Sequence, residues 1–267
     1  MVLAPTVRAG DATRLAAQGV AQGHDVIVAA GGDGTVNEVV NGIGASGALL
    51  GVLPLGTVNV FARELRIPLR LAAAWQVIEQ GTTRSLDLAQ AEFGGQRRWF
   101  VQLAGIGLDA HAVRSVSWEL KKRIGPLSYV WAALKIMRRD HVELAVVADG
   151  GAVVQHGAAG FVGNGRFYGG PFRLFPSAQL DDGKLDVCIF ESTHLLSVLR
   201  YSLGLLRGAH PELRGVIYFQ AAEVTCRAAS AVPFQLDGED AGDTPVRFTV
   251  KPRALRVLAP NIKQADG

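Results

Sequence analysis

The chain has 267 residues, of which 49% are hydrophobic and 19% are charged, with a formal net charge of +3 and a pI near 9.0. This composition is typical of a globular protein with a large core, and the length suits two domains better than one compact core. No run of the sequence approaches the ~18 uninterrupted apolar residues of a membrane span, and no nucleic-acid-binding motif is present, so we expect neither an integral membrane protein nor a nucleic-acid partner.

The first informative segment is a glycine-rich turn between a strand pattern and a helix pattern. Residues 26–30 are apolar and partly β-branched, which predicts a short buried strand, and residues 36–43 repeat apolar side chains at the spacing of one helix face. Between them stand Gly31, Gly32, Asp33, Gly34 and Thr35. Backbone N–H groups converge at such a turn and attract phosphate, and a carboxylate there indicates a Mg²⁺-nucleotide. A simple chain reversal explains the spacing equally well.

A second turn of the same kind follows. Residues 48–53 form another buried-strand pattern, residues 60–65 begin a helix, and the segment between them includes Gly56, Thr57 and Asn59. In open α/β sheets, ligands bind outside the carboxyl ends of the strands, so we expect both turns at one edge of a sheet. The pair of turns favours a phosphate site over a coincidence of loops.

Beyond a predicted helix at residues 69–80, the chain becomes rich in strand patterns. The predicted strands cover residues 85–92, 98–104, 143–149, 152–161, 185–190, 215–227, 234–236 and 246–250, with helical insertions at 110–139 and 195–206. The sequence therefore predicts an α/β nucleotide-binding domain over residues 1–84 and a larger, antiparallel β-rich, sandwich-like domain over residues 85–258. A C-terminal tail covers residues 259–267, and the active site is expected in the cleft between the two domains.

Several segments in a fixed order resemble the diacylglycerol kinase catalytic-domain family, which includes bacterial lipid kinases and the sphingosine and ceramide kinases. These segments cover residues 31–38, 54–59, 105–110, 164–170, 176–185 and 236–239. A lone Gly-Gly-Asp-Gly-Thr is shared with NAD kinases, whereas the ordered set is much more specific and runs from about Thr6 to Leu258. Family members usually open with a strand and an Asn-Pro-x-x-Gly loop, and no segment here matches them, so we expect this chain to lack that first strand and loop.

The resemblance implies that ATP binds at the two glycine turns, with Mg²⁺ held by Asp33. The implied nucleotide-binding positions are Thr6, Gly31, Gly32, Asp33, Gly34, Thr35, Val36, Asn37, Glu38, Gly56, Thr57 and Asn59.

A predicted strand ends in Asp237, Gly238 and Glu239, which places two carboxylates around a tight turn. Phosphorylating an alcohol needs a base that accepts the hydroxyl proton, and a carboxylate suits that task. The resemblance implies that Glu239 is this base and that Asp237 supports the metal or the hydroxyl. Taken alone, the same residues are typical of an ordinary acidic β-turn.

The resemblance also implies a second Mg²⁺ position away from the chemistry. Asp182 would supply a carboxylate, and Gln179 and Lys184 would supply backbone carbonyls, a mixture that hard cations accept. A type I′ turn at Asp182 and Gly183 before the next strand explains these residues nearly as well, and the two interpretations are compatible.

Residues 114–139 carry seven basic side chains, Glu119 as the single acid, and three aromatic side chains at Trp118, Tyr129 and Trp131. A basic and aromatic helical region can rest on an anionic membrane surface, while a solvated basic face with core aromatics fits equally well.

The remaining features bear on location and partners. Cys188 and Cys226 form no CxxC pair and are expected as buried reduced thiols, and the six histidines lack the spacing of a zinc site. The first residues lack the pattern of a secretory signal. We therefore expect a cytoplasmic protein, at most peripheral at the inner membrane surface, and a homodimer is allowed by the sequence.

The leading functional hypothesis is a lipid kinase that transfers the γ-phosphate of ATP to a hydroxyl of diacylglycerol, a sphingoid base or a related lipid. Two alternatives stay open at this point: an NAD kinase-like enzyme, and a catalytically impaired nucleotide-binding or regulatory protein.

Overall fold

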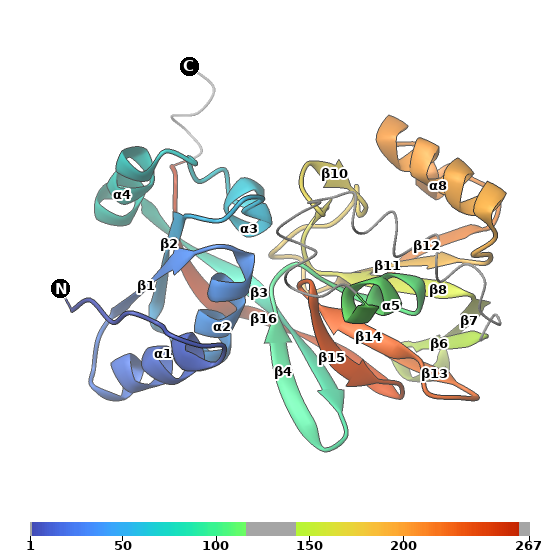
Figure 1. Cartoon of the computed structure of the whole chain (residues 1–267), viewed down its shortest axis with the longest axis horizontal. Helices are drawn as coiled ribbons and strands as arrows, with labels where there is room; N and C mark the ends of the chain where they lie inside the picture. Colours follow the sequence, from blue (N-terminus) through green and yellow to red (C-terminus); the bar gives the residue numbers. More distant parts are fainter. Residues whose placement is uncertain (1, 116–142, 262–267) are drawn as a thin grey trace.

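A computed structural model of the chain describes residues 2–115 and 143–261 and shows two units side by side (Figure 1). The N-terminal unit alternates helices and strands. Its elements are α1 (Asp11–Ala21), β1 (Val26–Gly31), α2 (Asp33–Ile43), β2 (Leu49–Pro54), α3 (Val60–Glu64) and α4 (Leu71–Gln80). These bounds confirm the two strand–turn–helix units expected from the sequence.

The C-terminal unit consists mostly of strands. They are β3 (Thr82–Phe93), β4 (Gln96–Phe100), β5 (Leu103–Ile106), β6 (Leu144–Ala148), β7 (Val153–Gly157), β8 (Ala159–Gly163), β9 (Phe167–Tyr168), β10 (Phe172–Arg173), β11 (Leu185–Phe190), β12 (Val216–Ala221), β13 (Glu223–Ala228), β14 (Pro233–Leu236), β15 (Glu239–Asp243) and β16 (Val246–Ala259). The helices that the structure describes in this unit are α5 (Leu108–Ser115), α8 (Leu195–Arg207) and the short 3₁₀ turns η1 (Asp149–Gly151) and η2 (His210–Glu212). No helix in the described ranges is long and apolar enough to cross a membrane.

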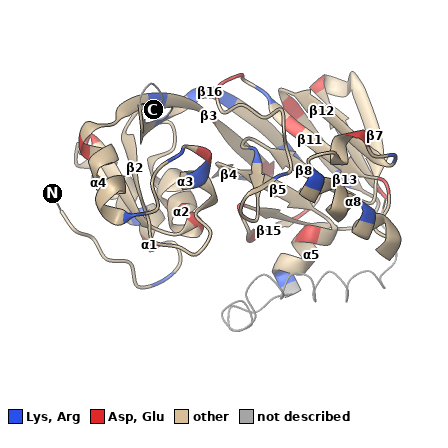
Figure 2. Cartoon of the chain, turned by 90° about the horizontal axis from the view of Figure 1, so that it is seen from above, with Lys and Arg blue, Asp and Glu red and all other residues tan. Residues whose placement is uncertain are grey.

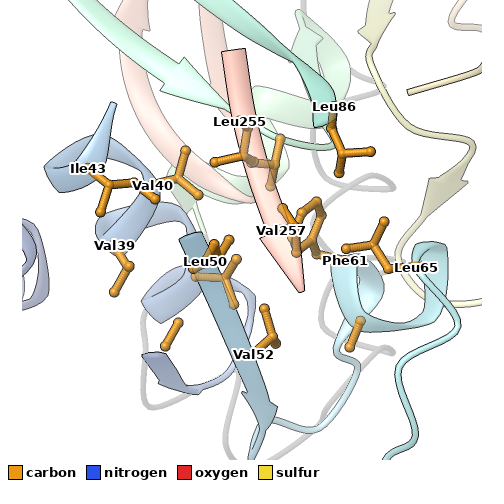
Figure 3. Close-up of a cluster of buried hydrophobic side chains, with 14 of the residues drawn as sticks. Val39, Val40, Ile43, Leu50, Val52, Phe61, Leu65, Leu86, Leu255 and Val257 are labelled. Atoms are coloured by element: carbon orange, nitrogen blue, oxygen red, sulfur yellow. The ribbon is translucent and has the colours of Figure 1, made fainter. Parts of the chain in front are cut away.

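In the N-terminal unit, β1 and β2 run parallel, and the end of β16 lies parallel to β2 on its other side. The last strand among the described residues therefore extends the sheet of the N-terminal unit. The predicted apolar face of α2 is buried against this sheet, because Val36, Val39, Val40 and Ile43 recur at helical spacing. Figure 3 shows three of them gathered with side chains of β2, α3, β3 and β16.

The C-terminal unit is a sandwich of two sheets. One is a six-stranded antiparallel sheet in the order β12-β11-β8-β5-β14-β15, and the other is the eight-stranded sheet that also contains β1 and β2. Between them, Phe248 makes edge-to-face contacts with Phe100 and Phe234, with ring centroids 5.9 and 6.2 Å apart. This confirms the predicted fold class, an α/β domain joined to a β-sandwich-like domain.

Three runs that the sequence predicted as single strands are pairs of strands. The runs at residues 98–104, 152–161 and 215–227 divide into β4 and β5, β7 and β8, and β12 and β13. In each pair, one strand belongs to the eight-stranded sheet and the other to the six-stranded sheet. Because both sheets bury side chains in one core, the apolar pattern continues across the break and conceals it.

Strands β3 and β16 run through both units, as Figure 2 shows from above. Their antiparallel pairing shifts register between Lys251 and Leu255, where Arg253 has a positive φ of 51°. The buried carboxylate of Asp87 on β3 accepts hydrogen bonds there from Arg253 N (2.7 Å) and from Gly183 N (2.6 Å). The two units are thus joined by continuous strands, and the expected boundary between residues 84 and 85 falls inside β3.

The two cysteines are free and buried, as expected, and burial raises the pKa of each thiol to about 12.

Candidate active site

The two glycine turns meet at the carboxyl edge of the parallel strands. Gly31 at the end of β1 is paired in register with Pro54 at the end of β2, and Leu55 N donates a hydrogen bond to Gly31 O (2.9 Å). The backbones of Gly32 and Gly56 touch, since a Cβ placed on Gly56 would lie 2.5 Å from Gly32 Cα. Only glycine permits this approach at position 56, and it brings the two turns into one surface.

That surface includes the N-terminus of α2. Gly32 precedes the helix in extended conformation, and the first helical hydrogen bond is from Val36 N to Gly32 O (3.1 Å). The N–H groups of Asp33, Gly34 and Thr35 lie in the first turn, where a helix offers donors and a positive dipole end to an anion.

Two of the predicted nucleotide residues build the turns themselves. Asp33 Oδ1 accepts a hydrogen bond from Phe61 N (3.1 Å) at the start of α3, so its carboxylate links the two turns. Asn59, with a positive φ of 53°, accepts from Gly56 N (2.9 Å) and donates to Gly56 O (2.7 Å), which closes the second turn.

Other predicted residues are not all gathered at this surface. The carboxylate of Glu38 accepts from Gly10 N (2.9 Å) and Ala12 N (3.0 Å), so it caps the start of α1. The side chain of Val36 is buried in the core, which leaves its backbone to contact a ligand. Thr6 and Thr57 are exposed, and Thr6 lies in the extended segment before α1.

Asp237 sits at the tip of the hairpin between β14 and β15, with a positive φ of 49°. Its side chain is partly buried, and its carboxylate accepts hydrogen bonds from four N–H donors. These are Asn37 Nδ2 (2.7 Å) and the backbone N–H groups of Val101 (2.8 Å), Gln102 (2.9 Å) and Leu103 (3.0 Å). Burial raises the pKa of this carboxyl, and the four donors oppose that shift. Asp237 and Asn37 therefore tie the hairpin to α2.

Glu239, two residues on, faces the glycine turn. A Cβ placed on Gly34 would lie 3.4 Å from Glu239 Oε1, and the other oxygen, Oε2, is 3.2 Å from Arg98 Nη2. Both side chains of this ion pair are partly exposed. The geometry brings a carboxylate and a guanidinium to the N-terminus of α2.

A second set of polar residues connects this hairpin to an apolar cavity. Gln235 Oε1 accepts from Gly238 N (2.6 Å), and Gln235 Nε2 donates to Asp109 Oδ2 (2.8 Å). Asp109 Oδ1 also accepts from the hydroxyl of Tyr168 (2.5 Å), and burial raises the pKa of its carboxyl. Asp109 and Tyr168 lie in the wall of the cavity.

The cavity has a volume of about 190 Å³ and lies among α5, α8 and strands of the six-stranded sheet. Its lining is mostly apolar, with residues Leu108, Asp109, Ala112, Ala159, Phe161, Tyr168, Leu174, Phe190, Ser192, Thr193, Val198, Tyr201, Ser202 and Leu205. A hydrogen-bonded path thus runs from this apolar space to the turn that carries Glu239.

Sequence reasoning missed Arg98, Asp109 and Gln235 as site residues. Arg98 follows another arginine in a hairpin, a pattern typical of an exposed strand. Asp109 had a usable signal, because it stands among apolar residues at the start of a helix, directly after a glycine turn.

The units are also joined beside the site. The buried carboxylate of Glu64 on α3 accepts from Arg166 Nε (2.7 Å) and Arg166 N (2.8 Å), and from Gln102 Nε2 (3.1 Å). These contacts fix the second glycine turn relative to the β-rich unit.

The predicted second metal position is a tight turn. Asp182 Oδ1 accepts from Lys184 N (3.0 Å), and Gln179 and Lys184 are exposed. Across the residues that the structure describes, no group of three or more His, Cys, Asp or Glu side chains is arranged to hold a metal ion. A turn is therefore observed here, but it is not of type I′, because Gly183 has a positive φ of 73° and Asp182 does not. A metal at Asp182 stays a prediction.

Most of the predicted membrane segment, residues 116–139, lies outside the described residues. Arg114, the first residue of the predicted segment 114–139, lies within the described residues. Its guanidinium donates to Asp240 Oδ1 (2.8 Å) and Asp243 Oδ1 (2.9 Å).

Two family descriptions match this chain and divide it between them. The diacylglycerol kinase catalytic domain matches residues 1–91, and the YegS C-terminal NAD kinase beta sandwich-like domain matches residues 103–259.

Similar proteins support the same assignment. Proteins named diacylglycerol kinase from Staphylococcus aureus strains RF122 / ET3-1 and JH9 are each 33% identical over 96% of this chain and 81% of their own length. A crystal structure from Bacillus anthracis str. Sterne, described as a candidate diacylglycerol kinase, superposes with a TM-score of 0.80 at 25% identity, over 97% of this chain and 83% of that one. The chain therefore belongs to the diacylglycerol kinase family, with the family's catalytic domain followed by a β-sandwich-like C-terminal domain.

Proposed function

We propose that this protein transfers the γ-phosphoryl group of ATP to a hydroxyl of a lipid alcohol, such as diacylglycerol or a sphingoid base. The observation that carries the proposal is the position of Glu239, whose Oε1 faces Gly34 in the first turn of α2. A base and a phosphate-binding helix terminus at this separation suit an in-line transfer between a bound nucleotide and a hydroxyl.

In this proposal, the phosphates of ATP lie against the backbone of Gly32, Gly34 and Thr35 and the turn at Gly56. The close contact of Gly32 and Gly56 supports this, because it leaves backbone without side chains at the surface. Mg²⁺ would be held by phosphate oxygens and by Asp33 Oδ2, a donor set with one carboxylate that suits this ion, and it would offset negative charge on the phosphates.

The proton of the acceptor hydroxyl passes to Glu239 as its oxygen bonds to the γ-phosphorus, and the bond to the β–γ bridging oxygen breaks to release ADP. Arg98 keeps the Glu239 carboxylate in place through their ion pair. The apolar cavity behind Asp109 is the space we assign to part of an acyl chain, since its lining is mostly apolar and its polar groups lead to Glu239.

The test is a transfer assay on the purified full chain, with ATP, Mg²⁺ and either a lipid extract or NAD, and with products identified by mass. We expect phosphorylated lipid, and a loss of about 10²- to 10⁴-fold in Glu239→Gln. Asp33→Asn should also abolish transfer while keeping the hydrogen bond to Phe61 N, which an alanine would remove.

Asp240→Asn is the matched control, because Asp240 lies on the same strand and pairs with Arg114 away from the glycine turn. It should leave turnover nearly unchanged. Phosphorylated NAD in place of lipid would assign the NAD kinase-like activity instead. Nucleotide binding with no transfer to either acceptor would favour a regulatory protein.

A further inference from the structure

The outward face of α8 is unusually apolar for a helix at the surface. Its five leucines, Leu195, Leu196, Leu199, Leu203 and Leu206, are between 46% and 81% exposed. They are five of the fourteen large apolar side chains exposed in the described part of the chain. At about 100° per residue, the five fall within an arc of roughly 100°, which we call the leucine face.

The opposite side of the same helix is also apolar, and it faces the rest of the fold. Val198, Tyr201 and Leu205 line the cavity described above, and the ring of Tyr201 lies 4.9 Å from that of Phe190. The fold therefore accounts for one apolar side of α8 and leaves the leucine face against water. Contiguous exposed apolar surface of this kind is typical of an interaction site.

Charge beside the leucine face indicates the nature of the partner. Arg200 and Arg207 follow its border on the helical wheel, and no acidic residue occurs within α8. Arg200 also donates to the backbone oxygen of Arg214, whose own side chain is exposed. An apolar strip bordered by arginines matches the boundary between acyl chains and anionic headgroups.

We propose that the leucine face of α8 docks on the surface of an anionic phospholipid bilayer, with its leucines in the acyl boundary and Arg200 and Arg207 at the headgroups. Because the other side of α8 walls the cavity, docking brings that cavity to the bilayer. This consequence rests on the proposed function. If the protein phosphorylates a lipid, a cavity placed at the bilayer lets the lipid acceptor pass from the membrane into the site without crossing water.

The test is flotation of the full chain with vesicles of phosphatidylcholine and phosphatidylglycerol, compared with vesicles of phosphatidylcholine alone. We expect the protein to float with the anionic vesicles. Leu196→Ser and Leu199→Ser should each weaken binding about tenfold, the loss expected when one leucine is no longer buried. Arg207→Gln should weaken it about fivefold on anionic vesicles and have little effect on neutral ones.

Leu71→Ser and Val154→Ser are matched controls, since these side chains are comparably exposed on α4 and β7. They should bind vesicles as the unmodified chain does. Equal flotation of the leucine variants and the unmodified chain would overturn the proposal, as would failure of the unmodified chain to float. Light scattering on the same variants measures the oligomeric state and tests the alternative that a second copy of the chain binds the leucine face. A dimer that the leucine variants convert to monomers would support that alternative and overturn the proposal.

Flotation does not depend on catalysis, so this outcome and that of the transfer assay are separable. If the leucine variants lose flotation and the chain transfers phosphate to no lipid, the docking surface stands and the proposed function fails. If the docking surface and the proposed function are both correct, the turnover of the leucine variants on vesicle-borne diacylglycerol should fall at least about tenfold. They should keep turnover on a short-chain diacylglycerol dispersed in water.

Discussion

At the scale of single residues, two neighbouring carboxylates of one hairpin have opposite surroundings. Asp237 accepts hydrogen bonds from four N–H donors, whereas Glu239 pairs, among the described residues, with Arg98 alone and lies beside the glycine turn. A group fully engaged by the protein holds structure, and a group at the surface of a binding site is available for chemistry. The structure thus separates two residues that the sequence placed together as catalytic candidates.

Asp237→Asn should lower the free energy of unfolding by about 2 kcal/mol or more. The asparagine NH₂ group cannot accept a hydrogen bond, so it would face N–H donors that now bond to a carboxylate oxygen. Urea unfolding measures this change. Asp240→Asn and Glu239→Gln are the comparisons, and each should change stability by less than about 0.5 kcal/mol, since their side chains are partly exposed. An equal loss in all three variants would contradict the structural role of Asp237.

Arg98→Gln should lower kcat at least about tenfold while stability changes by less than about 0.5 kcal/mol, because a half-exposed ion pair contributes little to folding. Steady-state kinetics with ATP and the lipid acceptor measures the effect. Arg97→Gln is the control: successive side chains of a strand point to opposite faces, and Arg97 pairs with Glu92 instead. Matched activity of the two variants would exclude a role for Arg98 in holding Glu239.

At the scale of elements, α8 is fixed to the sandwich through the 3₁₀ turn that follows it. His210 in this turn is fully buried, its Nε2 lies 2.8 Å from Leu174 O, and its Nδ1 has no hydrogen-bond partner among the described residues. Nε2–H therefore donates to the carbonyl, and a proton added at Nδ1 would be buried without an acceptor. Burial lowers the pKa of His210 for this reason.

Stability should therefore decrease in acid. Below about pH 6.5 the unfolded chain takes up a proton at His210 that the folded chain does not, so each pH unit costs at most about 1.4 kcal/mol until the lowered pKa is passed. Urea unfolding between about pH 7 and pH 5 measures this slope. His210→Gln should reduce the slope, whereas His24→Gln, at an exposed position, should retain it. An unchanged slope in His210→Gln would assign the acid sensitivity to other groups.

At the scale of the whole molecule, β3 and β16 join the two units into one folding unit. Val257 near the end of β16 is level with Leu50 of β2 and is buried in the core of the N-terminal unit, while the first half of β16 pairs with β13 in the sandwich. A domain that borrows a strand from its neighbour cannot stay folded when the neighbour unfolds.

Calorimetry should therefore give a single transition, with matching calorimetric and van't Hoff enthalpies. Val257→Ala should shift that whole transition to lower temperature, by the equivalent of about 1–3 kcal/mol, without splitting it. Val154→Ala, at an exposed site on β7, should leave it in place. Two separate transitions would show that the units unfold independently.

The sequence predicted what is local and missed what is distant. The two glycine turns were predictable because a strand, a turn and a helix N-terminus are encoded by adjacent residues. Asn37 and Asp237, which hydrogen-bond across 200 positions, carry no such local signal. Nor does the parallel pairing of β16 with β2, since strand periodicity reports burial and says nothing of which strand lies alongside. The roles of Glu38 and Asn59 in capping and turn closure likewise depend on side-chain direction, which spacing does not give.

The membership of β16 in both units also sets an order of events during synthesis. The strands and helices around the glycine turns emerge from the ribosome long before β16, yet β2 is left with an unpaired edge until that strand arrives. An unfinished chain therefore exposes a sheet edge at β2. A product that ends before β16 is therefore expected to be a substrate for chaperones and proteases.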